Sequence, residues 1–327
     1  MILGIECTAH TFGVGIVQKR KVLANIKDMY KPEKGGIVPI EAAKHHSQVA
    51  PFIYAQALAA AKTDETKIKA IALSNAPGLA PCLLAGLRFA QGKAHELKVP
   101  IIPVNHCISH LEIGQNEGAK DPVLLYVSGA NTQVIAYLGE RYRVFGETLD
   151  IGVGNFIDKF ARLIDIPFPG GPKVELLALE AKKHEMPYIE LPYSIKGMDV
   201  SFSGMQTKLV QLFDQGVGAE ELAFSLQETA FAMLVEAAER ALAHTKKKEL
   251  VLGGGVACNF RLQEMCKIMC SERKAKFFCP AREFLVDNAG MIAYTGELMF
   301  NAGVKEKAEN VDIKPRERTD EIIIRWK

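Results

Sequence analysis

Two histidines, His106 and His110, have the spacing of a pair that can bind one metal ion. On a helix, residues four positions apart lie on the same face about one turn apart, so both imidazoles can reach one ion. Imidazole is the commonest metal ligand in proteins, so the pair predicts a metal site, with surface or core histidines as the alternative. The metalloprotease motif H-E-x-x-H is absent, because position 107 is cysteine.

A second candidate site is the glycine run that follows the apolar stretch 249–252. Gly253, Gly254 and Gly255 separate this expected strand from an expected helix over 260–270. A strand, a glycine turn and a helix N-terminus let a ligand approach the backbone closely, which indicates nucleotide binding. The alternative is a packing turn. The run matches neither the P-loop nor the dinucleotide-binding glycine pattern.

Two short turns carry hydroxyl groups, and one acid begins a helix. The turns cover 6–11 and 128–132, each between two expected strands. Each is either a tight hairpin or a loop whose N–H groups face a phosphate. Asp287 begins an expected helix through residue 296, where an aspartate most often acts as an N-cap.

Composition narrows the class of protein. The chain has 327 residues, 48% hydrophobic and 24% charged, with a net charge of +2. It has no apolar run long enough for a membrane span and no basic N-terminal leader, so we expect a cytoplasmic protein without a membrane partner. Seven cysteines without a C-x-x-C pair indicate free thiols, and Cys266 and Cys270 are expected to be buried helix residues. The basic clusters 246–248 and 314–318 are interpreted as solvated surface.

Strands and helices alternate along the chain, which predicts an α/β fold. The expected strands are 2–5, 12–17, 22–29, 68–73, 100–104, 123–127, 133–138, 141–146, 249–252, 276–279 and 321–326. The expected helices are 40–61, 82–97, 152–164, 207–213, 219–245 and 260–270. A further helix is expected to be opened by the Gly/Pro loop 168–175 and to run to about residue 183. Pro51 should kink or split its helix, and His45 and His46 are interpreted as surface or contact residues. Residues 34–39 are expected to form a loop.

The chain repeats its layout near residue 120. Residues 123–146 show the same order as residues 2–29: strand, small polar turn, strand, turn, strand. This predicts two related domains, 1–120 with the histidine pair and 121–327 with most of the nucleotide site. Two such domains with a nucleotide cleft between them are typical of the actin-like ATPases and sugar kinases, a tandem actin-like, RNase H-like α/β fold.

Taken together, these segments resemble the universal tRNA N6-threonylcarbamoyladenosine synthase (glycoprotease-like) family, closest to the archaeal catalytic subunit of the KEOPS complex. The resemblance covers essentially the whole chain. It rests on Asn105-His106-Cys107-Ile108-Ser109-His110, Leu125-Tyr126-Val127-Ser128-Gly129-Ala130-Asn131-Thr132, Phe145-Gly146-Glu147-Thr148-Leu149-Asp150-Ile151, Pro169-Gly170-Gly171-Pro172, Ser201-Phe202-Ser203-Gly204, residues 253–259 and Asp287-Asn288. Ala130 stands where many relatives have the second glycine of a Ser-Gly-Gly turn.

The resemblance implies a set of site residues. The implied metal ligands are His106, His110, Tyr126 and Asp287, holding one divalent or trivalent ion, with iron favoured over zinc because of the phenolate. The implied contacts to an adenylate or ATP-type nucleotide are Tyr126, Val127, Ser128, Gly129, Ala130 and Asn131 at the phosphate and acyl group, Asp158, Gly171 and Glu175 at the ribose, and Gly254, Gly255 and Asn259 at the adenine.

The resemblance also implies an acyl transfer. The threonylcarbamoyl group of L-threonylcarbamoyl-adenylate would pass to N6 of the adenosine 3′-adjacent to the anticodon in ANN-decoding tRNA, with release of AMP. Implied partners are tRNA, the enzyme supplying the adenylate, and other KEOPS subunits including a small atypical kinase. No general base is identified. The alternatives are a nucleotide-switched interaction protein of the actin-like group and, least favoured, a metalloendopeptidase with Glu112 as the only nearby glutamate.

Overall fold

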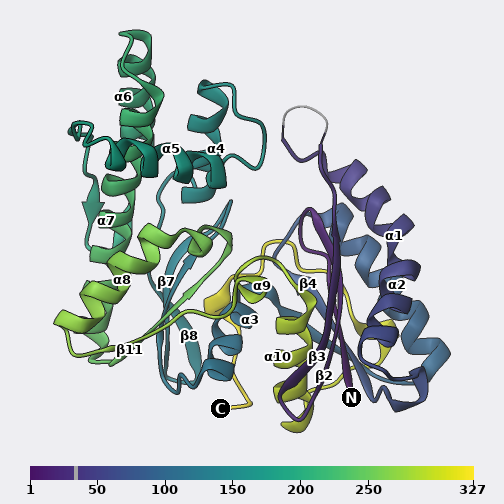
Figure 1. Ribbon diagram of the computed structural model, residues 1–327. Helices are drawn as coiled ribbons and strands as arrows, with labels where there is room; N and C mark the ends of the chain where they lie inside the picture. The colour runs from purple at the N-terminus through teal and green to yellow at the C-terminus, as the bar shows by residue number, and fades with distance from the viewer. Residues whose placement is uncertain (33–35) are drawn as a thin grey trace. The chain divides into compact units, whose positions relative to one another are not determined.

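The computed structural model describes residues 1–32 and 36–327 (Figure 1). Residues 33–35, which include the first two positions of the loop expected at 34–39, lie outside this description. The chain forms two compact units. Unit 1 comprises Met1–Glu117, Leu138–Tyr142 and Val286–Lys327, and unit 2 comprises Gly118–Tyr137 and Arg143–Leu285. The division at residue 120 stays a prediction; the first boundary between the units lies near it, whereas the last segment groups with unit 1.

Unit 1 contains a five-stranded mixed sheet in the order β3-β2-β1-β4-β5. The first three strands form an antiparallel meander, and β4 and β5 run parallel to β1. The strands are β1 (Ile2–Glu6), β2 (Thr11–Gln18), β3 (Lys21–Met29), β4 (Ala70–Ala76) and β5 (Ile101–Asn105). Their positions confirm the strands expected in this part of the chain.

Side-chain alternation gives the two faces of this sheet different coverings. Leu3 and Ile5 point into the core that α1 (Pro39–Ala60) and α2 (Ala80–Leu97) complete. Gly4 faces the opposite way, toward α10 (Ala289–Asn301), where an added Cβ would lie 2.4 Å from the Ala293 nitrogen. Glycine therefore allows α10 to pack directly on the sheet backbone.

Helix α1 differs in two ways from the expectation. It runs without interruption through Pro51, so a split there is wrong; buried Ala50 and Ile53 hold both sides of the proline against the core. Of the two interpretations of His46, surface or contact residue, the surface one is wrong, because the side chain is fully buried and contacts Ala9. Its Nε2 lies 3.0 Å from the carbonyl oxygen of Ala9.

Burial of His46 predicts acid sensitivity. Burial lowers the pKa of His46 to about 4, whereas an unfolded histidine titrates near pH 6.5. Between these values the unfolded chain binds a proton that the folded chain does not, so stability falls as pH falls. We expect wild type to lose about 2 kcal/mol more than His46→Gln between pH 7 and pH 5. Urea unfolding at both pH values measures this, with exposed His184→Gln as control. Equal pH dependence of wild type and His46→Gln would contradict the prediction.

Unit 2 repeats the sheet topology of unit 1. The strand order is β12-β11-β6-β7-β8, again a meander extended by two strands parallel to its first member. The repeat expected from the sequence layout is therefore confirmed. The strands are β6 (Val123–Val127), β7 (Thr132–Leu138), β8 (Arg141–Glu147), β11 (Glu249–Gly253) and β12 (Lys276–Phe278), with a separate pair β9 (Ile195–Lys196) and β10 (Asp199–Val200).

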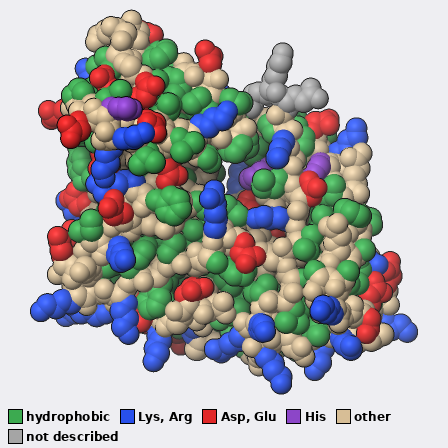
Figure 2. Space-filling view, in the orientation of Figure 1, with side chains coloured by type: hydrophobic (Ala, Val, Ile, Leu, Met, Phe, Trp, Pro, Cys, Tyr) green, Lys and Arg blue, Asp and Glu red, His purple; other side chains and the backbone are tan. Residues whose placement is uncertain are grey.

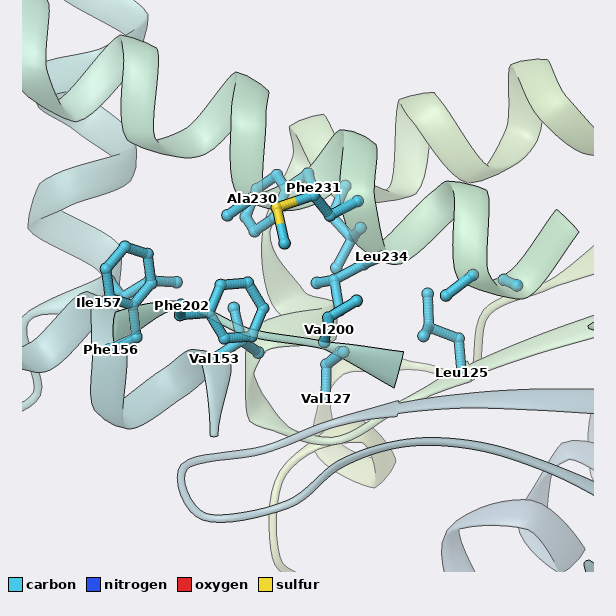
Figure 3. Close-up of a cluster of buried hydrophobic side chains, with 14 of the residues drawn as sticks. Leu125, Val127, Val153, Phe156, Ile157, Val200, Phe202, Ala230, Phe231 and Leu234 are labelled. Atoms are coloured by element: carbon cyan, nitrogen blue, oxygen red, sulfur yellow. The ribbon is translucent and has the colours of Figure 1, made fainter. Parts of the chain in front are cut away.

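The helices of unit 2 enclose one apolar core (Figure 3). Phe156 and Phe202 stack within it, with ring centroids 5.3 Å apart. Cys266 and Cys270 are buried here, as expected. The helices are α4 (Val153–Leu163), α5 (Gly171–Lys183), α6 (Ser203–Asp214), α7 (Ala219–Thr245), α8 (Phe260–Glu272) and α9 (Arg282–Leu285). Short 3-10 turns lie at Glu65–Lys67, Ile113–Glu117, Gly255–Cys258, Ala308–Asn310 and Thr319–Glu321.

The C-terminal segment belongs to unit 1 and contains no strand 321–326, so that expectation is wrong. Ile323 makes only an isolated bridge to Arg141, the first residue of the edge strand β8, and the pairing does not extend into a ladder. Trp326 instead donates from Nε1 to Glu112 Oε1 at 2.8 Å. The tail is thus held by side chains rather than by a strand ladder.

Charges of both signs are interspersed over the face seen in Figure 2, in keeping with the small net charge. In the described part of the chain, every helix is too short or too polar to cross a membrane.

Candidate metal centre and nucleotide loops

Helix α3 (His106–Glu112) begins directly where β5 ends. Asn105 is its N-cap: the side-chain oxygen accepts hydrogen bonds from the N–H groups of Cys107 at 3.0 Å and Ile108 at 3.3 Å. This cap makes His106 the first helical residue and places His110 one turn later. Both histidines are buried, with ring centroids 4.9 Å apart.

Asp287 lies beside the histidine pair. One potential ligand atom from each of His106, His110 and Asp287 lies within 4.8 Å of the others. The N-cap interpretation of Asp287 is wrong, because the next residue caps α10: Asn288 Oδ1 accepts from the Met291 N–H at 2.9 Å. The Asp287 carboxylate instead faces His106 Nε2 at 3.4 Å.

A buried carboxylate that the sequence analysis did not single out supports His106 from behind. Glu6, at the end of β1, is fully buried, and its Oε2 lies 2.9 Å from His106 Nδ1. Its other oxygen accepts from the N–H and the hydroxyl of Thr8. The available signal was an acid directly after an apolar strand. Since the N–H groups of Cys7 and Thr8 both bond within the protein, neither of them faces a phosphate.

The electrostatics of this cluster favour a cation. Burial alone would lower the pKa of His106, but Glu6 and then Asp287 outweigh it and raise that pKa well above the ordinary value. Burial, helped by His106, lowers the pKa of His110 to about 3, so its imidazole is neutral. Burial opposes ionisation of Asp287, yet His106 holds the pKa of this carboxyl well below its usual range. The cluster therefore offers a carboxylate and a neutral imidazole as donors.

The donor set fits a transition metal. Two imidazoles and one carboxylate are typical ligands of zinc and of non-haem iron. The fourth predicted ligand, Tyr126, is buried at the end of β6 in unit 2, and its participation stays a prediction. Lys27 Nζ donates to the Asp287 carbonyl oxygen at 2.9 Å, which fixes the backbone of that residue.

In unit 2, the turn after β6 packs on the start of α4. The N–H groups of Gly154 and Asn155 donate to the carbonyl oxygens of Ser128 and Gly129, at 3.1 and 2.9 Å. The Asn131 N–H donates to Ser128 Oγ at 3.1 Å, which closes the turn. Gly129 and Ala130 are exposed at its tip. The turn is therefore closed by its own hydrogen bonds and leaves its tip exposed.

Two carboxylates predicted to contact the ribose accept hydrogen bonds from the backbone at the starts of α5 and α8. Asp158 on α4 accepts from the Gly170 N–H at 2.8 Å and so positions the start of α5. Glu175 on α5 accepts from the Phe260 N–H at 2.7 Å, at the start of α8. Burial raises the pKa of Glu175.

The predicted adenine-side residues complete this set of contacts. Asn259 is the N-cap of α8 and accepts from the Arg261 N–H at 2.9 Å. Gly254 has φ +93, and an added Cβ there would lie 2.3 Å from the Val127 carbonyl oxygen. Since Val127 precedes Ser128, the contacts run from β6 through α4, α5 and α8 back to β6. The structure thus gathers the predicted nucleotide residues around neighbouring ends of β6 and β11.

The glycines of this region fall into two groups. Gly254 is required by its backbone conformation and by its contact with β6. Gly171 and Gly255 differ: neither has positive φ, and an added Cβ would meet no heavy atom within 4 Å. At these two positions the backbone is bare toward open space, where a ligand can lie against it.

Asp150 is a second residue that holds the backbone of a neighbouring segment in place and whose role the sequence did not predict. Its carboxylate accepts from the N–H groups of Phe202 at 3.0 Å and Ser203 at 2.8 Å, and from the Ser201 hydroxyl. Burial alone would raise its pKa, but these hydrogen bonds hold the pKa of Asp150 well below its usual range. The signal was its place in the motif 145–151, and it caps α6.

Comparison with known proteins shows the family of the chain. The family model described as "TsaD: tRNA N6-adenosine threonylcarbamoyltransferase" matches residues 21–294. The chain belongs to the TsaD family. A relative from Thermococcus kodakarensis, named tRNA N6-adenosine threonylcarbamoyltransferase, is 54% identical over 325 residues, which cover 99% of each chain. The chain is also 51% identical to a "Probable bifunctional tRNA threonylcarbamoyladenosine biosynthesis protein" of Methanosarcina mazei, matching 99% of this chain and 59% of that one.

Solved structures with low sequence identity support the expected fold. HypF from T. kodakarensis aligns with a TM-score of 0.65 at 14% identity, covering 93% of this chain and 48% of HypF. A component of (R)-2-hydroxyglutaryl-CoA dehydratase from Acidaminococcus fermentans aligns with a TM-score of 0.55 at 11% identity, covering 90% and 96%. These likenesses concern the fold alone, and they agree with tandem actin-like α/β domains.

Proposed function

We propose that this TsaD-family chain transfers the threonylcarbamoyl group of L-threonylcarbamoyl-adenylate to N6 of the adenosine 3′-adjacent to the anticodon in ANN-decoding tRNA, releasing AMP. The observation that carries the proposal is the buried cluster of His106, His110 and Asp287 in a chain of this family. An adenosine in an anticodon loop is single-stranded, so its base edge can be presented to a pocket.

His106, His110 and Asp287 would hold one metal ion, with Tyr126 as the fourth ligand and iron favoured over zinc. When bound, the ion supplies Lewis acidity that polarises or orients the threonylcarbamoyl group. A neutral His110 suits this role, because it can bind a metal without first losing a proton.

The loops of unit 2 would hold the AMP part of the donor, which is also the leaving group. The turn 128–131 would take the phosphate, with Tyr126 and Val127 beside it. Asp158 and Glu175 can accept hydrogen bonds from the ribose hydroxyls, and Gly171 and Gly255 let the nucleoside lie against the backbone. Gly254 and Asn259 set the position of the adenine side. Because no covalent enzyme intermediate is needed, positioning supplies much of the rate.

The proposed partners follow from this reaction. They are the tRNA, an enzyme that supplies the adenylate, and other KEOPS subunits including a small atypical kinase. The names of the bifunctional relatives support a link to further threonylcarbamoyladenosine biosynthesis components. The proposed compartment is the cytoplasm.

Peptide hydrolysis is disfavoured by the position of Glu112. This carboxylate is fully buried, and it accepts hydrogen bonds from Tyr142 Oη and Trp326 Nε1. It is therefore held in a side-chain network and not placed to activate a water molecule. A nucleotide switch without chemistry is disfavoured by the imidazole ligands, since actin-like ATPases bind Mg²⁺ through oxygen atoms.

The test uses the purified chain, its partner subunits, donor labelled in threonine, and an ANN-decoding tRNA. We expect label on the anticodon-adjacent adenosine after nuclease digestion, and none with His106→Ala, which should still bind ATP. Absence of label with wild type, while the donor remains intact and the partners are present, would overturn the proposed transfer. Full transfer by His106→Ala would remove the metal from the proposal.

A further inference from the structure

The buried side chain of Glu6 contacts the candidate metal ligand His106 and is itself held by Thr8. The side chain is completely buried at the end of β1, far in sequence from His106, yet Oε2 approaches His106 Nδ1 to 2.9 Å. The other oxygen, Oε1, accepts from the Thr8 N–H at 2.8 Å and from the Thr8 hydroxyl. A buried carboxylate costs several kcal/mol unless it is paired and hydrogen-bonded, as it is here.

The direction of the bond to His106 decides the state of the imidazole. An ionised carboxylate only accepts hydrogen bonds, so the hydrogen must be on His106 Nδ1. In the neutral ring, the lone pair is then on Nε2, which is the nitrogen 3.4 Å from Asp287 Oδ1. The contact therefore places the lone pair on the side of the ring that faces Asp287.

We propose that Glu6 is a positioning residue that selects the metal-binding tautomer and ring orientation of His106. This inference rests on the proposed metal site. A partner of this kind behind a ligand typically contributes 10- to 100-fold to metal affinity. Thr8, through its two donors, holds Glu6 in place.

The experiment measures metal affinity by chelator competition with Zn²⁺, and separately with Fe²⁺ under anaerobic conditions. Glu6→Gln keeps the shape of the side chain but introduces an amide that can donate to Nδ1, which removes the tautomer preference. We expect the Kd of the ion to rise about 10- to 100-fold. Thr8→Val removes the hydroxyl that donates to Glu6 and lies 3.4 Å from His106 Nδ1, and it should raise the Kd less because Glu6 itself remains.

Glu112→Gln is the matched control. Glu112 is also fully buried, lies on the same helix as the histidines and has its own hydrogen-bond partners, Tyr142 and Trp326. We expect its metal Kd to stay within about twofold of wild type, because no contact joins it to His106. Thermal unfolding of the metal-free proteins shows whether each variant is folded.

A second readout does not depend on affinity. In the zinc-loaded wild type, ¹⁵N spectra should show His106 protonated at Nδ1, and Glu6→Gln should show a mixed or reversed tautomer. Unchanged affinity and tautomer in folded Glu6→Gln would overturn the role of Glu6, as would an equal loss in Glu112→Gln. If wild type takes up neither metal, the proposed metal site itself fails, which is a different result.

Discussion

His110→Ala is expected to abolish stable metal binding and to reduce threonylcarbamoyl transfer about a thousandfold. The imidazole is buried next to His106 and Asp287, and its lowered pKa keeps it neutral at physiological pH. Loss of the metal removes several kcal/mol of transition-state stabilisation, and each 1.4 kcal/mol is a factor of ten in rate. Metal analysis of the purified variant and the single-turnover rate of label transfer measure the two effects.

The matched control is His184→Ala, the same substitution at an exposed histidine in unit 2 that forms an ion pair with Glu180. Its metal content and rate should remain within about twofold of wild type. A normal rate in folded His110→Ala without bound metal would show that the cluster has no catalytic part.

The second large effect is expected at Gly255. In Gly255→Ala the new methyl group meets no protein atom within 4 Å and the backbone is not left-handed, so the variant should fold with unchanged or slightly raised stability. The methyl group would instead occupy the space proposed for the nucleoside. We expect the Kd for ATP to rise at least about tenfold, which corresponds to about 1.4 kcal/mol. Calorimetric titration and thermal unfolding give both values.

Gly254→Ala separates binding from folding. At this neighbouring glycine, φ is +93 and the Val127 carbonyl oxygen is 2.3 Å from an added Cβ. Here we expect a stability loss of about 1–3 kcal/mol or more, together with weaker binding. If Gly255→Ala binds ATP as well as wild type, the nucleoside does not lie against this backbone.

The sequence predicted those parts of the fold that depend on local pattern. Helix α7 has the predicted bounds, 219–245, because its apolar positions recur at helical spacing over many turns. The strand before His106 and the repeated meander were predicted from short apolar runs separated by polar turns. The strand expected at 321–326 is absent, because Trp326 and Ile323 are held by contacts with residues distant in sequence.

At the candidate site, the metal-ligating residues were easier to predict from the sequence than the residues that hold them in position. Asp287 and Asn288 are adjacent, and either can cap a helix; only the packing of α10 determines that Asn288 does so. Glu6 is separated from His106 by about a hundred positions, and no local spacing signals their contact. Asp150 was visible within a motif, but its capping of α6 depends on tertiary structure.

The arrangement of unit 1 has a consequence for synthesis on the ribosome. The last strand of its sheet ends at Asn105, whereas α10, which covers one face of that sheet, begins at Ala289. At translation rates of 5–20 residues per second, that face waits roughly ten to forty seconds for its helix. Gly4 and Gly15 line the waiting face, and they offer backbone rather than large apolar side chains to passing chains. The two glycines that let α10 pack closely thus leave bare sheet backbone on that face until the helix has been made.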